Sequence, residues 1–169
     1  MSQLIKIDSN YAKWIQDISM RFQSMQIKAV TKVNREMLLF YLTLGRDIVE
    51  LHADSKWGNK FYANLSRDLA EALPNVKSFS ETNLKYMKYF YQLYSQISPQ
   101  LVDENAAEEI SPQLVDELCK IPWGHHRYII DKCKNKPEKA ILYVRKTIEN
   151  NWSRAVLLNW LGTDLYERQ

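Results

Sequence analysis

The chain has 169 residues, of which 46% are hydrophobic and 25% are charged, and its formal net charge at pH 7 is +3. This length allows one domain with a core of its own, and the composition is not that of a disordered chain. Two cysteines are too few and too far apart for a zinc knuckle or a redox CxxC motif. The amino terminus lacks the apolar run of a signal peptide, and no stretch approaches a membrane span, so we expect a cytoplasmic protein without a membrane partner.

The first predicted element is a long helical segment, residues 11–51. Apolar residues recur there at steps of three or four without an intervening proline, which is typical of helix. A straight helix of this length would span about 60 Å, more than the diameter of a small domain. The segment therefore either breaks once, near residues 26–28 or Gly45, or packs against another chain as a protein-interaction or homodimerisation surface. The sequence leaves these alternatives open.

A helix pair follows, at residues 59–72 and 81–96. Pro74 ends the first helix, and Ser80 has the position of an N-cap for the second. Helix, connector and capped helix have the outline of a helix-turn-helix, although the connector is longer than usual. An ordinary helical hairpin would give the same pattern. The predicted core stripe of the second helix is Leu84, Met87, Tyr91 and Tyr94.

The next segment, residues 97–118, is acidic and contains a direct repeat, "ISPQLVDE", at 97–104 and 110–117. We interpret it as a loop insertion, with a short helix that begins at Ser111-Pro112. Further helices are expected at 123–133, at 138–150 and after Ser153, where a serine again has the position of an N-cap. The sequence thus predicts a single all-α domain of about seven helices with no confident strand.

Catalytic and metal-binding motifs are absent from the sequence. His125 and His126 are adjacent, so on a helix they point about 100° apart and do not chelate one ion together. There is no nucleophile elbow, Walker loop or dinucleotide fingerprint. Only Asp54-Ser55-Lys56 places a carboxylate two residues before a lysine, and it lies in a polar turn. We predict no catalytic residue, no metal, no cofactor and no enzymatic activity for this chain.

Nucleic-acid binding has positive support. Residues 119–146 carry eight lysines and arginines against two acidic residues. Such a block is typical of a contact face, and lysine and arginine bind phosphates. In the helix pair, Asn83 has the chemistry to bond base edges. The predicted nucleic-acid contacts are Lys77, Ser80, Asn83, Lys85, Lys88, His125, His126, Arg127, Lys132, Lys134, Arg145, Lys146 and Arg154.

Several stretches together resemble the amino-terminal domain of YhcG-like proteins. They are "WGNKFYANLSRDLAEALPNVKSFSETNLKYMKYFYQLY", "IPWGHHRYIIDK", "AILYVRKTIENNWSRAVLLNWL" and "LYERQ", in this order. The resemblance implies a helical domain that precedes a carboxy-terminal nuclease domain of the PD-(D/E)XK superfamily. It also implies that residues 163–169 begin the linker to that nuclease domain, which this chain lacks. No catalytic residue is carried over from the family.

These observations lead to one functional hypothesis and one alternative. The hypothesis is a non-catalytic DNA-binding and targeting domain of a YhcG-like nuclease, with DNA and the nuclease domain as partners. The alternative is a protein-interaction or homodimerisation module that uses residues 11–51.

Overall fold

A computed structural model describes residues 11, 13, 34–97, 110–163 and 165–168 of the chain. The described residues form helices and no strand, which confirms the all-α prediction. The helices are residues 34–50, α3 (Ala53–Lys56), α4 (Phe61–Ala72), α5 (Glu81–Ser95), α6 (Pro112–Leu118), α7 (Trp123–Cys133), α8 (Pro137–Asn150) and α9 (Arg154–Leu161).

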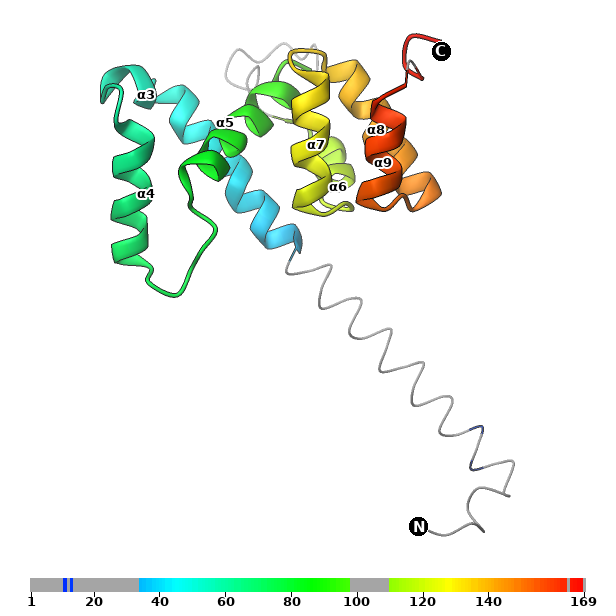
Figure 1. Ribbon diagram of the computed structural model, residues 1–169, viewed down its shortest axis with the longest axis horizontal. Coiled ribbons are helices and arrows are strands. Elements are labelled where there is room, and N and C mark those ends of the chain that lie inside the picture. Colours follow the sequence, from blue (N-terminus) through cyan, green and yellow to red (C-terminus); the bar gives the residue numbers. More distant parts are fainter. Residues whose placement is uncertain (1–10, 12, 14–33, 98–109, 164, 169) are drawn as a thin grey trace.

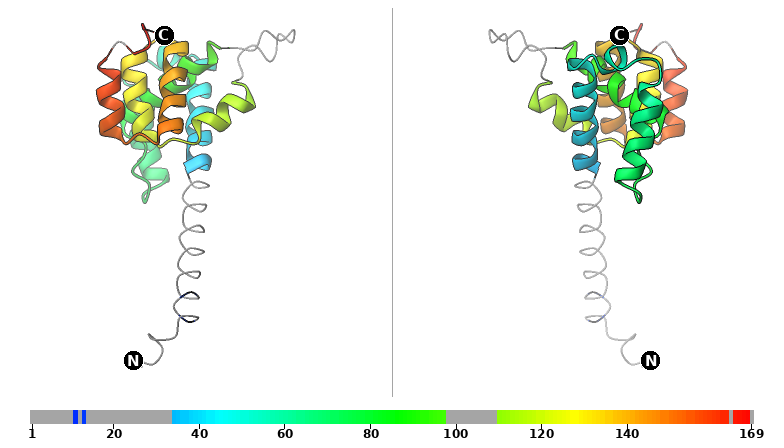
Figure 2. Two further views of the ribbon diagram at one scale, coloured as in Figure 1. Left: turned by 90° about the vertical axis from the view of Figure 1, so that its right-hand side faces the viewer. Right: turned by 90° about the vertical axis from the view of Figure 1, so that its left-hand side faces the viewer.

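Helix α5 is the centre of the arrangement. It packs against α4 on one side and against α7 on the other, while α8 and α9 pack on α7 (Figure 1). Helices α7, α8 and α9 lie side by side in each of the views in Figures 1 and 2. The α3–α4 end and the α7–α9 end of the molecule are therefore joined through α5 and residues 34–50.

The side chains of α5 explain its central place. The four residues of its predicted core stripe are all buried, and Phe90 and Leu93 are buried as well. A helix that is apolar over more than one face packs against several neighbours. As predicted, Ser80 caps this helix, because its hydroxyl accepts a hydrogen bond from the Asn83 N–H at 3.1 Å.

The helix of residues 34–50 runs through Gly45 without a break, so the predicted break at that glycine is wrong. A Cβ atom at Gly45 would lie 2.1 Å from the carbonyl oxygen of Met87, which no real contact allows. The glycine therefore permits a close approach to α5 instead of ending a helix. The other predicted break, at residues 26–28, and about half of the predicted 11–51 interface lie outside the described residues.

Helix α6 contains most of the second copy of the repeat and is part of the core. The short helix predicted to begin at Ser111-Pro112 is confirmed, but Leu114 and Leu118 are buried in the main hydrophobic cluster, so this part of the acidic segment is not an exposed insertion. Ser111 caps the helix by accepting from the Leu114 N–H at 3.2 Å. Apart from Ile97, the first copy lies outside the described residues. None of the described helices is both long and apolar enough to span a membrane.

Candidate nucleic-acid interface

Asn83 joins α5 to α7. Its side-chain amide donates a hydrogen bond to the Ser78 carbonyl at 2.6 Å, and its Oδ1 accepts one from the Trp123 indole at 2.7 Å. The Trp123 ring also contacts Phe90, with the two centroids 5.1 Å apart. Both ends of the Asn83 carboxamide are thus engaged within the protein, which fits a structural role better than the predicted contact with a base edge.

The two adjacent histidines lie inside the protein. His126 has no exposed surface, and its Nε2 donates to the Leu118 carbonyl at 2.7 Å. His125 is only 8% exposed, and its Nε2 donates to the Trp152 carbonyl at 2.9 Å. These bonds tie the start of α7 to α6 and to the loop before α9. The prediction that both histidines belong to a phosphate-binding surface is therefore wrong, because buried, bonded rings do not reach a ligand.

Burial also changes the acid–base properties of His126. Removal of the ring from water lowers its pKa from 6.5 to about 4, and the neighbouring His125 adds to this effect. The bond to Leu118 opposes the shift but does not cancel it. The imidazole is therefore neutral at physiological pH and adds no positive charge to the surface.

Some of the predicted cationic contacts are neutralised by carboxylates. Lys88 pairs with Asp54, which lowers the pKa of that carboxyl. On α8, the Arg145 Nε lies 3.0 Å from a Glu117 carboxylate oxygen. Lys146 lies 3.9 Å from Glu149, one turn along the same helix. These lysine and arginine residues are weaker candidates for phosphate contacts because their charge is already balanced.

Arg127 on α7 and Arg154 at the start of α9 make no ion pair with any described residue, in contrast to these pairs. They line one hollow of about 200 Å³. The guanidinium carbon of Arg127 lies 4.6 Å from the centroid of the Tyr86 ring, a cation–π arrangement. Two guanidinium groups without an ion pair to a described residue, beside one hollow that they share with the Asp131 carboxylate, have the chemistry to bind an anion such as phosphate.

Two smaller features shape this hollow. The Tyr86 hydroxyl donates to Asp131 Oδ1 at 2.7 Å, which raises the pKa of the tyrosine. Gly124 lies against Arg154, since a Cβ atom at this glycine would be 3.0 Å from the Arg154 Cδ. The Arg154 side chain therefore crosses the first turn of α7 at a place where a larger residue would push it away.

The remaining predicted contacts fall into two groups. Lys85 lies with its ammonium group 5.5 Å from the centroid of the Tyr62 ring, and the Ser80 hydroxyl is used as a helix cap. Lys77, Lys132 and Lys134 are exposed, and none of them makes an ion pair with a described residue. Lys77 belongs to the connector between α4 and α5, whereas Lys132 and Lys134 lie at the end of α7. Of the predicted contacts, the structure thus brings together Arg127 and Arg154 at one hollow, whereas Lys77, Lys132 and Lys134 do not line it.

Sequence reasoning missed Tyr86 and Asp131, which line the same hollow. Both residues lie off the apolar stripes of their helices, which is the one signal that could have singled them out. Among the described residues, no group of three or more His, Cys, Asp or Glu side chains could hold a metal ion. The thiols of Cys119 and Cys133 are buried, and burial raises the pKa of each, so neither is an activated nucleophile.

Comparison with known proteins places the chain in a family. No curated protein and no solved structure matches it. A family model, the DUF1016 N-terminal domain, matches residues 17–168. This match is consistent with the resemblance to the amino-terminal domain of YhcG-like proteins. Because it spans almost the whole sequence, the chain belongs to the DUF1016 N-terminal domain family.

Proposed function

We propose that this chain is a non-catalytic DNA-binding domain that positions DNA for the PD-(D/E)XK nuclease domain of YhcG-like proteins. The observation that carries the proposal is the pair of unpaired arginines, Arg127 and Arg154, beside one hollow. Phosphate groups supply most of the affinity of a DNA-binding protein, and a guanidinium group binds them through two parallel hydrogen bonds.

The surroundings of the two arginines support this role. Tyr86 holds the Arg127 guanidinium over its ring, which reduces the freedom that the side chain would lose on binding. His125 fixes the loop before α9, and Ser153 caps α9 by accepting from the Val156 N–H at 3.3 Å, so the first residue of this helix, Arg154, has a defined backbone position. The arginines are thus placed before any ligand arrives, which lowers the cost of binding.

The test compares two double variants of the 169-residue chain. One is Arg127→Ala/Arg154→Ala, and the matched control is Arg145→Ala/Lys146→Ala, which removes the same number of charges from α8. Fluorescence anisotropy would measure the affinity for labelled DNA at several salt concentrations. The first variant should bind at least about tenfold more weakly, because two charge-assisted hydrogen bonds are lost. The slope of log K against log salt should fall by about two.

The control variant should bind within about twofold of the unmodified chain, since ion-paired surface charges contribute little. Equal losses in the two double variants would mean that only net charge matters, and the assignment of this hollow would be wrong. Absence of DNA binding by the unmodified chain at low salt would overturn the proposed function itself.

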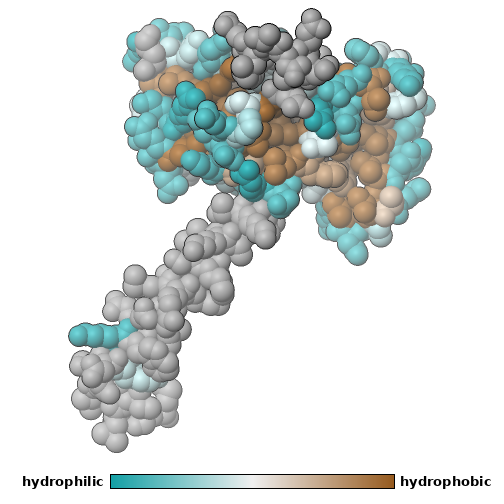
Figure 3. All heavy atoms as spheres, turned by 180° about the vertical axis from the view of Figure 1, so that it is seen from behind, coloured by the Kyte–Doolittle hydropathy of each residue, from teal (hydrophilic) through white to brown (hydrophobic). Residues whose placement is uncertain are grey.

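A second candidate function, assembly through residues 11–51, is favoured by exposed apolar side chains. In the described part of this segment, Phe40 and Leu51 are 51% and 53% exposed. Figure 3, which views the molecule from behind, also shows hydrophobic side chains at the centre of that face and toward the α3–α4 end. Light scattering during size-exclusion chromatography would test this function: a dimer mass that Phe40→Ser/Leu51→Ser reduces to a monomer mass supports it, and a monomer mass for the unmodified chain refutes it.

A further inference from the structure

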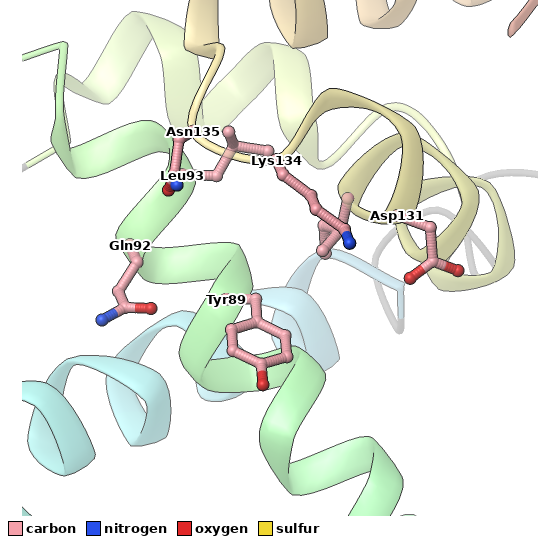
Figure 4. Close-up of a pocket in the computed structure, with 7 residues that line it drawn as sticks. Tyr89, Gln92, Leu93, Asp131, Lys134 and Asn135 are labelled. Atoms are coloured by element: carbon pink, nitrogen blue, oxygen red, sulfur yellow. The ribbon is translucent and has the colours of Figure 1, made fainter.

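The groove between α5 and α7 contains a second, larger cavity beside the arginine hollow. Its volume is about 430 Å³, within the rough range of 300–1,000 Å³ of small-molecule sites. Asp131 lines both cavities, so they are neighbours along one groove. Figure 4 shows the lining residues of the larger cavity, with Tyr89 and Gln92 on α5 and Asp131 on α7.

We propose that this cavity binds an unpaired nucleobase, so that the domain prefers single-stranded DNA to duplex DNA. This inference rests on the proposed function and names the substrate class for it. The base would occupy the cavity between α5 and α7, and the adjoining phosphates would lie on Arg127 and Arg154.

Tyr89 supplies a surface on which a base can stack. The residue is 44% exposed, and its ring borders the cavity. The Tyr86 ring meets it edge-on, at a centroid distance of 6.3 Å and an interplanar angle of 83°. This contact restrains the Tyr89 ring while leaving it accessible. Aromatic side chains of this kind bind single strands because every base has a face that stacks.

The polar groups of the cavity match the edge of a base. Gln92 and Asn135 each line it, and neither side-chain amide has a hydrogen-bond partner in the described part of the chain. Each amide offers both a donor and an acceptor, as the edges of bases require. Figure 4 shows the two amides on the same side of the cavity, apart from Asp131.

Charge separates the roles of the two cavities. The larger one contains a single carboxylate, Asp131, and a single ammonium, Lys134, and is therefore close to neutral. The smaller one contains the same carboxylate with two guanidinium groups and is positive. A phosphate is therefore attracted to the smaller, positive cavity and gains little in the larger one. A neutral base with amino or imino donors suits the larger cavity, because the carboxylate there accepts hydrogen bonds.

A base in a duplex does not fit this arrangement. Its faces are covered by the neighbouring bases, and its hydrogen-bonding edge is paired. To enter a cavity between two helices, a base must leave the stack, and this costs least when the strand is already single. The geometry thus favours single strands or unpaired ends over intact duplex.

The experiment measures anisotropy with three labelled ligands: a short single strand, the corresponding duplex, and a strand of the same length in which every residue is abasic. The unmodified chain should bind the base-bearing strand most tightly. Tyr89→Ala should weaken binding to that strand by about tenfold, from loss of one stacked base. It should leave the abasic strand unaffected, and Tyr89→Phe, which keeps the ring, should restore the affinity.

Gln92→Ala has a matched control in Gln96→Ala, one turn further along the chain and outside the cavity. The first should weaken binding to the base-bearing strand by a few fold and the second should not. Thermal unfolding of each variant checks that the fold is intact.

Three results would overturn the inference: equal affinity for base-bearing and abasic strands, a Tyr89→Ala variant as tight as the unmodified chain, or full displacement of the strand by a free mononucleotide at equal concentration. If one of these results is obtained but Arg127→Ala/Arg154→Ala still binds DNA more weakly than the unmodified chain, the proposed DNA-binding function stands and only the nucleobase site is wrong. If the unmodified chain binds none of the three ligands, both fail together.

Discussion

On its inner side, helix α7 buries His126, Ile129 and Cys133 completely, whereas on its outer side Arg127 lies over the Tyr86 ring beside an open hollow. Both sides of the helix carry residues with basic side chains, histidine on the inner side and arginine on the outer side. On the inner side these residues hydrogen-bond to neighbouring helices, and on the outer side they have no ion-pair partner in the described chain. A predicted contact therefore becomes a candidate only after its partners within the protein are known.

The comparison has a clear experimental form. Changes on the inner side should lower the free energy of unfolding, and changes on the outer side should lower the affinity for DNA at unchanged stability.

The largest effect is expected for Asn83→Ala. This change removes two hydrogen bonds and leaves the Trp123 indole N–H without its acceptor. We expect the free energy of unfolding to fall by about 2–3 kcal/mol, from the net value of two bonds and the cost of an unsatisfied donor. Urea denaturation would measure it, with the exposed neighbour Thr82→Ala as control. A stable Asn83→Ala variant that has lost DNA binding would instead restore Asn83 as a base contact.

The next effect concerns pH and His126. Because its pKa is lowered to about 4 in the folded chain, the unfolded chain takes up the proton first as pH falls below about 6.5. The free energy of unfolding is therefore highest above that pH, and it decreases as the pH falls toward 4. At pH 5 the loss relative to pH 7.5 should be about 2 kcal/mol.

Denaturation curves between pH 7.5 and pH 4.5 would measure this loss, with His126→Gln as the comparison. The variant keeps all other titrating groups, so its stability should depend less steeply on pH over this interval. Identical pH profiles for the two chains would show that His126 does not titrate in this way.

The local pattern predicted much of the fold because helix ends are encoded by neighbouring residues. A helix was predicted at residues 123–133, directly after Pro122, and α7 has the bounds Trp123–Cys133. The serine caps were equally readable. By contrast, the Asn83–Trp123 bond joins residues far apart in the chain, and no local pattern contains it.

Gly45 is a second case in which the local sequence pattern does not contain the tertiary contact. In a sequence, a glycine in a helical pattern is read as a possible break. In the fold it lies against the Met87 backbone, a contact that depends on how two distant helices approach each other. The candidate site was predicted only in part for this reason. The arginines were visible in the sequence as charges, but tertiary packing decides that they make no ion pair with a described residue and that Tyr86 and Tyr89 lie beside the two cavities.

A smaller effect is expected where the two sides of α7 meet, at Gly124. A methyl group in Gly124→Ala would press on the Arg154 side chain and move its guanidinium group away from the hollow. The helix should tolerate the change, since alanine favours helix by about 1 kcal/mol over glycine. We expect DNA affinity to fall about threefold, a fraction of one charge-assisted bond, with unchanged or higher thermal stability. Unchanged affinity would mean that Arg154 finds the phosphate from its new position.

The smallest effect is expected for Glu117→Gln, which would free Arg145 on α8. The Arg145 Nε now lies 3.0 Å from the Glu117 carboxylate, so this cation is balanced in the folded chain. Its release should raise DNA affinity at low salt by less than about twofold, and the gain should vanish at high salt, because an exposed charge away from the hollow acts only through the screened field of the protein. The anisotropy titration of the arginine variants would measure it. A gain as large as the loss in Arg127→Ala/Arg154→Ala would place the DNA on α8 and reverse the assignment of the two surfaces.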